Sequence, residues 1–274
     1  MQTNCVQTKS GSGCFMVEEK LLLDFAMSVG DVMIRNGAET QRVENTIEII
    51  LSTSNYHLMP ETFVTPTGIF ASINGPLNGT ITKIKRIDRR DINLEKVSAA
   101  NDLSRRFVNG EVTLRKAFEE INDIDRHPTY RTLTMVIAHM IIVFSFTLLF
   151  SGTLNDALIS ATVGMVMGFR MKLFKKIRLA NFVRSLAASM MATATVLLWH
   201  HFGLTDNYEV IIIGAIMPLV PGFAITNGAK DVMYGDYVSG SARMMDAILT
   251  AVFIAAGVGI MLTLYNYLMG GAAL

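Results

Sequence analysis

Five long apolar segments fill the second half of the sequence and constrain its fold more than any other feature. They run approximately from Leu133 to Ser151, Leu154 to Phe169, Leu179 to His200, Val210 to Ala229 and Ala247 to Leu268. A helix needs about 20 apolar residues to cross the hydrocarbon of a bilayer, and each segment is near that length, the second being the shortest. Backbone polar groups in lipid must be bonded within the chain, so we expect these segments to be helices.

The first half of the sequence has a different composition. Overall the 274 residues are 51% hydrophobic and 17% charged, which is too apolar for an ordinary soluble domain and too charged for a chain buried in membrane throughout. Most charged residues precede Arg131. We predict a disordered leader over residues 1–16, a small α+β domain over 17–130 and a five-span transmembrane domain over 131–274. The net charge of +1 indicates no nucleic-acid partner.

Apolar spacing and turn residues indicate the elements of the domain. A helix is expected from Val17 to the turn at Gly37, and a second follows, capped by Asn36 or Thr40. The runs TFVTPTGIFASI and TITKIKRI predict a hairpin, with Pro66 at an edge or bulge. Two further helices are expected over 93–109 and 113–124. Cys5 and Cys14 lack a partner cluster, so they predict neither a disulfide framework nor a zinc site.

The sequence RNGAETQRVE, which joins the first two expected helices, places charged groups close together. Glu39 falls on the inward side at the start of the second helix, with Arg42 three residues later and Glu44 beside it. A helix N-terminus favours a carboxylate there, and Arg42 could pair with it in an ordinary first-turn salt bridge. The same cluster could instead do acid–base work. The familiar phosphate-loop, nucleophile-elbow and HExxH motifs are absent, so we predict no catalytic residue, metal site or cofactor.

The fourth apolar segment is interrupted by Pro218, Pro221 and Gly222. Proline removes helical hydrogen bonds, and freed backbone groups at membrane depth are tolerated only against protein or a water-filled cavity. Broken helices of this kind are common in transporter sites, although a simple structural kink is the alternative. Arg184, one turn inside the third segment, could attract a carboxylate or snorkel to the interface. His139 could relay a proton or simply bond a neighbouring helix.

The distribution of basic residues predicts the orientation. RMKLFKKIR separates the second and third segments, and Lys230 and Arg243 separate the fourth and fifth, whereas SGT and HFGLTDNYE contain no Lys or Arg. The positive-inside rule puts the basic loops in the cytoplasm. We therefore expect a cytoplasmic N-terminal domain and an external C-terminus, in an α-helical integral membrane protein with one proline-broken helix.

Two motifs together resemble a known family. GAETQRVE, followed in order by PLVPGFAITNGAKDVMYGDYVSG, is similar to the threonine/serine exporter (ThrE) family, in its short split form like the YjjP component of the YjjP/YjjB pair. The resemblance implies a bacterial inner-membrane exporter of threonine and serine, or of a dicarboxylate such as succinate. It also implies a second small membrane subunit, YjjB-like, that supplies further spans in a homo- or hetero-oligomer.

The family pattern selects two groups of residues in this sequence. The first lies in the domain: Glu39, Thr40, Arg42 and Glu44. The second lies on the expected pathway: Pro218, Pro221, Gly222, Asn227, Asp231, Asp236, Ser239 and Gly240. Our leading hypothesis is a proton-coupled exporter of a small polar solute, with Asp231, Asp236 and His139 as the titratable groups. One alternative is a membrane-anchored hydrolase that uses Glu39, Arg42 and Glu44. Another is that the N-terminal domain acts as a gate or sensor for the membrane part.

Overall fold

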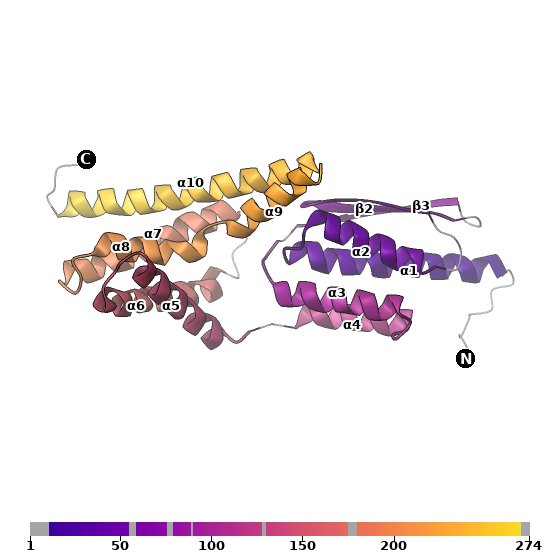
Figure 1. The fold of residues 1–274 in the computed structure, drawn as a ribbon, viewed down its shortest axis with the longest axis horizontal. Helices are drawn as coiled ribbons and strands as arrows, with labels where there is room; N and C mark the ends of the chain where they lie inside the picture. Colours follow the sequence, from indigo (N-terminus) through magenta and orange to yellow (C-terminus); the bar gives the residue numbers. More distant parts are fainter. Residues whose placement is uncertain are drawn as a thin grey trace. The chain divides into compact units, whose positions relative to one another are not determined.

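The fold of the chain is described from a computed structural model, which describes residues 11–54, 59–75, 79–88, 90–127, 130–174 and 180–269. It divides into two compact units (Figure 1). One comprises Met1–Thr129 and Thr226–Arg243, and the other comprises Tyr130–Ile225 and Met244–Leu274. The first unit thus contains a segment from late in the sequence that the predicted domain over 17–130 omits.

The first unit has four helices of its own and one sheet. Its elements are α1 (Gly11–Arg35), α2 (Thr40–Ser52), β1 (Met59–Thr65), β2 (Gly68–Gly75), β3 (Gly79–Arg86), α3 (Leu94–Val108) and α4 (Leu114–Arg126). Residues 11–16 are helical, so our expectation of disorder there is wrong, and residues 1–10, including Cys5, lie outside the described residues. The side chain of Cys14 lies outside them too.

The sheet has three antiparallel strands in the order β1-β2-β3, where we expected a hairpin of two. The run TFVTPTGIFASI does not form one strand with a proline at its edge. It turns back at Pro66 and Thr67, and Thr65 pairs with Gly68 while Phe63 pairs with Phe70. Proline lacks the N–H that a continuing ladder needs, and its fixed φ suits a tight turn.

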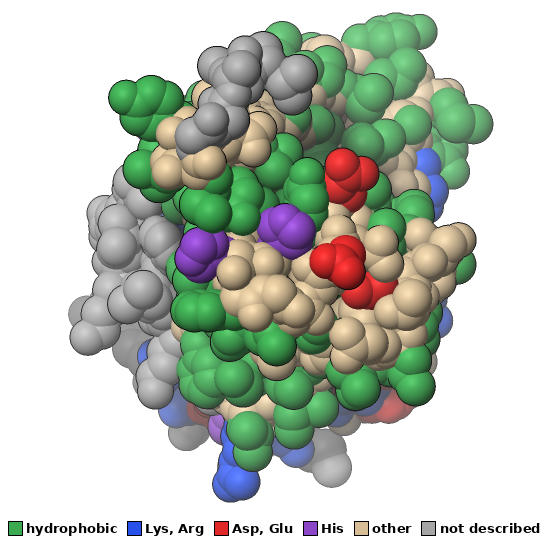
Figure 2. Space-filling model, turned by 90° about the vertical axis from the view of Figure 1, so that its left-hand side faces the viewer, with side chains coloured by type: hydrophobic (Ala, Val, Ile, Leu, Met, Phe, Trp, Pro, Cys, Tyr) green, Lys and Arg blue, Asp and Glu red, His purple; other side chains and the backbone are tan. Residues whose placement is uncertain are grey.

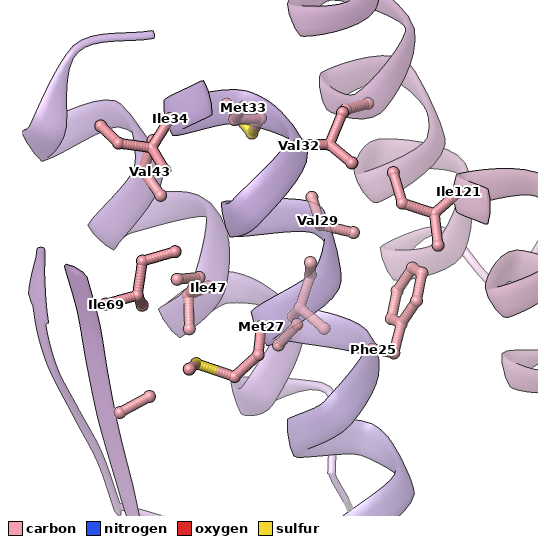
Figure 3. Close-up of a cluster of buried hydrophobic side chains, with 14 of the residues drawn as sticks. Phe25, Met27, Val29, Val32, Met33, Ile34, Val43, Ile47, Ile69 and Ile121 are labelled. Atoms are coloured by element: carbon pink, nitrogen blue, oxygen red, sulfur yellow. The ribbon is translucent and has the colours of Figure 1, made fainter. Parts of the chain in front are cut away.

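Three layers build the core of this unit. Helices α1 and α2 contact the sheet, and α3 and α4 contact α1 on its other side (Figure 1). In Figure 3, Met27 lies on the side of α1 that faces Ile69 of the sheet, whereas Phe25 lies toward Ile121 of α4. The Phe25 ring also packs 4.9 Å from that of Phe107. A helix between two layers must be apolar on both sides, which explains why α1 is buried over most of its circumference.

The second unit is a bundle of apolar helices. It contains α5 (Thr132–Leu149), α6 (Leu154–Phe174), α7 (Asn181–His201), α8 (Tyr208–Ile216) and the short 3₁₀ helix η1 (Met217–Leu219). The start of α9 (Gly222–Met233) and most of α10 (Tyr237–Leu268) also belong to it. A buried cluster that includes Val143, Val163 and Met167 joins the helices.

Among the described residues, three helices are long and apolar enough to cross a membrane: α5, α7 and α10. A fourth candidate is the pair Tyr208–Leu219 and Gly222–Met233, which is bent by 50°. The apolar part of α6, Leu154–Phe169, is shorter than the others. The chain is therefore mostly helical, with three or four candidate spans, and a fifth span remains a prediction.

Side chains of unlike kinds gather on one face of the molecule. Figure 2 shows hydrophobic side chains over much of this face, around a central group of acidic and histidine side chains. Lys and Arg side chains are visible only near its margins. The face thus combines an apolar periphery with a polar centre that carries little positive charge.

The contact between α5 and α6 depends on glycine and generates a first prediction. A Cβ at Gly164 would lie 2.6 Å from the His139 backbone oxygen and 2.7 Å from Met140 Cα. Because backbone atoms cannot move aside cheaply, Gly164→Ala should destabilise the protein by about 1–3 kcal/mol. We expect its apparent melting temperature in detergent to fall by several degrees.

The control is Gly259→Ala, at a helical glycine where an added Cβ meets nothing within 4 Å. Alanine has the higher helix propensity, so this variant should melt at the same temperature or higher. Equal losses in the two variants would contradict close packing at Gly164.

Candidate functional site

The first part of the site is the 37–40 connector, the residues Gly37–Thr40, which follow α1 and end with the first residue of α2. Its backbone is fixed by Gly37, with φ +99°, and by a hydrogen bond of 3.0 Å from Ala38 N to Met33 O. Only glycine adopts such a φ without strain. Neither residue expected to cap α2 does so: the Asn36 side chain donates to Val32 O, and the N-cap position is occupied by Glu39 without a side-chain cap bond.

The second part is the α9–α10 hairpin, residues Thr226–Arg243. We expected a basic loop between the fourth and fifth apolar segments, but the chain forms two helices here, joined by a turn at Tyr234–Asp236. Asp236 Oδ1 accepts a hydrogen bond of 3.0 Å from Ser239 N, which caps α10. A Cβ at Gly240 would lie 3.0 Å from Gly228 O, so the glycine lets the two helices approach closely.

Each residue of the connector contacts one residue of the hairpin. Two contacts use connector carbonyls and two use connector side chains. They are Asn227 Nδ2 to Gly37 O at 3.1 Å, Arg243 Nη2 to Ala38 O at 3.1 Å, Lys230 Nζ to Glu39 Oε1 at 2.7 Å, and Thr40 Oγ1 to Asp231 Oδ1 at 2.6 Å. The two motifs found in the sequence therefore meet, although Thr40 and Asp231 are 191 residues apart.

The centre of this contact is a buried ion pair. Arg243 Nε lies 2.9 Å from Asp231 Oδ2, and the side chains are only 11% and 2% exposed. Buried charges are costly to desolvate, and removing one partner leaves the other uncompensated. Asp231 has both oxygens engaged, one by Thr40 and one by Arg243. Both partners belong to the hairpin, so the pair holds α10 against α9, and the connector contacts this pair through Thr40 and through Ala38 O.

The edge strand β1 is held by side chains from both parts of the chain. Val64 N donates to Glu44 Oε1 at 2.8 Å, and Val64 O accepts from Ser239 Oγ at 3.4 Å. These contacts use the outward-facing backbone groups of an edge strand. Burial raises the pKa of Glu44, the nearby carboxylates of Asp236, Glu48 and Asp231 raise it further, and the Val64 N–H opposes the shift.

Glu39 and Arg42 do not form the first-turn salt bridge that we considered. Glu39 pairs with Lys230 of the hairpin, with side chains 23% and 46% exposed, and the ammonium group lowers the pKa of the Glu39 carboxyl despite partial burial. Arg42 is exposed, and within the described part of the chain it has no ion-pair partner. It lines a hollow between α2 and α3 instead.

Several predicted site residues lie in the other unit. Pro218 lies in η1, Pro221 O accepts the first hydrogen bond of α9 from Ile225 N, and Gly222 is the first residue of that helix. Arg184 donates to Asn181 one turn earlier in α7. His139 Nδ1 lies 2.8 Å from Met135 O, one turn earlier in its own helix α5, whereas we had considered a bond to a neighbouring helix.

Sequence reasoning did not include in the site some of the residues that build it. Lys230 and Arg243 were noted only as basic charges, and Gly37, Ala38 and Val64 contribute through their backbones. Lys230 and Arg243 could have been found, because a cation next to an apolar segment usually has a specific partner. Backbone partners leave no such signal, because any residue type can supply a carbonyl.

The fold and site together define a class of protein: a helical membrane protein whose proline-bent helix continues into a hairpin bonded to a small α+β unit. The chain belongs to the ThrE family, described as "Putative threonine/serine exporter", whose sequence model matches residues 24–265. It is 20% identical over 245 residues to the threonine/serine exporter of Corynebacterium glutamicum, covering 87% of this chain and 50% of that protein.

A second relative is an uncharacterized protein of Schizosaccharomyces pombe, 21% identical over 259 residues, which cover 90% of this chain and 30% of that protein. The chain thus spans half or less of the length of these relatives. No solved structure matches the chain. Within the described residues, no group of three or more His, Cys, Asp or Glu side chains could hold a metal ion.

The buried pair generates a second prediction. Asp231→Asn leaves Arg243 buried without its counter-charge, so it should destabilise the protein by about 3–5 kcal/mol. Arg243→Met should cost a similar amount, whereas the double variant should lose less than the sum of the two. Apparent melting temperatures of the three purified variants test this. The matched control is Arg115→Gln, whose pair with Glu119 is exposed and should contribute no more than about 0.5 kcal/mol. Additive losses would contradict the pairing.

A third prediction compares two glutamates with opposite pKa shifts. Because the pKa of Glu39 is lowered in the fold, its stabilisation is present above the unfolded pKa and is lost as pH falls through the folded value. Glu44 has a raised pKa, so its stabilisation is present below the unfolded pKa and is lost as pH rises through the folded value.

Glu39→Gln should therefore lower the melting temperature at pH 7 and lower it less at pH 4. Glu44→Gln should be neutral or stabilising at pH 7, because the amide oxygen can still accept from Val64 N and no charge is buried. The measurement is the melting temperature of each variant and wild type across this range. The same sign of effect in both variants would refute the opposing shifts.

Proposed function

We propose that the chain is a component of an exporter that moves a small polar solute out of the cell. The observation that carries the proposal is membership of the ThrE family over residues 24–265. A candidate span bent by 50° is the kind of element that transporter sites use, because half-helix ends offer backbone groups and dipoles to a solute. The same helix continues into the hairpin that the connector holds.

The pathway in this proposal begins at the break over Pro218, Pro221 and Gly222. Solute would bind to backbone groups freed there, and Arg184 would attract a carboxylate. Asn227 and Asp231, farther along α9, would transmit movement of that helix to the connector, because both residues are bonded to it. Asp236, Ser239 and Gly240 would keep the hairpin rigid while it moves.

Proton coupling is a further part of the proposal. Asp231 is the favoured coupling group, since protonation would remove the charge that holds Arg243 and weaken the contact with the connector. Asp236 serves as a helix cap and His139 is bonded to its own helix, so both have structural roles already. The N-terminal unit would then act as a gate controlled by the contact between the connector and the hairpin.

Threonine, serine and a dicarboxylate such as succinate are the proposed solutes. The exporter of C. glutamicum is named for threonine and serine, and succinate comes from the resemblance to the split form. All three carry a carboxylate, which an arginine or a helix N-terminus recognises. The split form is also the basis for proposing a YjjB-like second membrane subunit, with the assembly in the bacterial inner membrane.

For orientation we propose a cytoplasmic N-terminal unit and an external C-terminus. Besides the positive-inside rule, a face with few visible Lys and Arg side chains (Figure 2) is consistent with a non-cytoplasmic side. The hydrolase alternative gains no support from the geometry, because Glu39 and Glu44 each already hold a structural partner, Lys230 and Val64 respectively.

The experiment is uptake of labelled threonine, serine and succinate into inverted membrane vesicles. The chain is expressed alone and with the YjjB-like subunit, and an imposed pH gradient is present or collapsed. We expect gradient-dependent accumulation of one solute class with the pair. Asp231→Asn should reduce this accumulation about tenfold or more. The milder Thr40→Val, which removes one hydrogen bond to Asp231, should reduce it about threefold.

Asp88→Asn serves as the control, because Asp88 is 75% exposed and its ion pair with Arg86 lies on the surface. Uptake is normalised to the amount of each variant in the vesicle membrane. Accumulation of none of the three solutes under any condition would overturn the exporter. Accumulation that ignores the pH gradient would overturn proton coupling alone.

A further inference from the structure

A hollow lies in the first unit between one face of α2 and one face of α3. Its volume is about 540 Å³, within the range of small-molecule sites. The lining residues recur at helical spacing on both helices, from residue 41 to 49 and from 101 to 109. Glu39 of the connector and Tyr234 of the hairpin turn complete the lining. The two parts of the functional site thus both border the hollow.

Two arginines line the hollow, and one of them, Arg42, acts electrostatically on the nearby Glu39 without forming an ion pair with it. Arg42 and Arg105 are exposed, and across the described ranges neither takes part in an ion pair. Arginines nearby behave differently: Arg106 pairs with Asp102 and Glu120, and Arg115 with Glu119. A guanidinium group presents a planar fork of donors that matches a carboxylate. The hollow therefore offers two unpaired donors suited to an anion.

The remaining polar groups add capacity for hydrogen bonding. Asn45 and Asn101 line the hollow from opposite helices, and within the described residues their side-chain amides have no protein partner. An amide can both donate and accept, so these two groups suit an ammonium, a hydroxyl or a second carboxylate. Apolar side chains are few, Ile49 and Val108 among them. The composition favours a small polar molecule over a lipid or an apolar peptide.

We propose that this hollow is a binding site for a small carboxylate-bearing solute, with Arg42 and Arg105 as its carboxylate-binding residues. Its identification with the exporter's own solute class rests on the proposed function above, because α-amino acids and dicarboxylates share the carboxylate. Glu39 and Tyr234 at its edge connect occupancy to the hairpin, since Glu39 is bonded to Lys230. The site would sense cytoplasmic solute and is separate from the membrane pathway.

Binding to the purified full-length chain in detergent tests the proposal without a membrane or a gradient. The probes are threonine, serine and succinate, measured by isothermal titration calorimetry. Threoninol, which lacks the carboxylate, is the chemical control. We expect at least one carboxylate to bind and threoninol not to bind. Arg42→Gln and Arg105→Gln should each weaken that binding about tenfold or more, the effect of losing one charge-assisted hydrogen bond.

Arg115→Gln is the matched variant, because Arg115 is 92% exposed and outside the hollow. It should bind like wild type, and all variants should retain the wild-type melting temperature. Three results would overturn the proposal: no binding of any carboxylate, equal binding of threoninol, or binding unaffected by both arginine substitutions. If vesicles still accumulate solute while any of these three binding results is obtained, the sensing site is overturned and the exporter is not. Carboxylate binding without transport would overturn the exporter instead.

Discussion

The ion pair between Asp231 and Arg243 is the interaction on which the arrangement of the first unit depends. Two nearly buried charges must face each other, and the remaining oxygen of Asp231 needs a donor, which Thr40 provides. This requirement joins a hairpin from late in the chain to a connector near its start. The surrounding contacts, from Asn227 to Gly37 O and from Arg243 to Ala38 O, satisfy backbone carbonyl groups of that connector.

Much of the fold could be predicted from the sequence because the determining forces are local or periodic. Helical spacing of apolar residues indicated α1 and α2, Gly37 indicated the turn between them, and apolar length indicated the membrane helices. The predictions were wrong where local turn residues interrupted the pattern of apolar residues. Pro66 turned one expected strand into two, and the segment after Met233, expected as a loop, turns once and continues as helix.

The candidate site was predicted only in part. Glu39, Thr40, Asn227 and Asp231 were selected as two separate groups, and nothing in their spacing said that one group would contact the other. Long-range pairing of side chains is set by tertiary packing, which neither propensity nor periodicity encodes. For Arg42, sequence spacing predicted a pair that does not form. Its position three residues from Glu39 suggested a local pair, but a lysine from the hairpin occupies that place.

The contacts of the connector differ in strength, and this difference decides what a solute could change. The Glu39–Lys230 pair is partly exposed, and such pairs contribute about 0–1 kcal/mol, whereas breaking a buried pair costs about 3–5 kcal/mol. A ligand shifts a conformational equilibrium only by its difference in affinity for the two states. A carboxylate bound at Arg42 and Arg105 could therefore reposition Glu39 and Lys230 at low cost. The Asp231–Arg243 pair lies within the hairpin and is more costly to break, so the proposed sensing and the proposed proton coupling would act on different contacts.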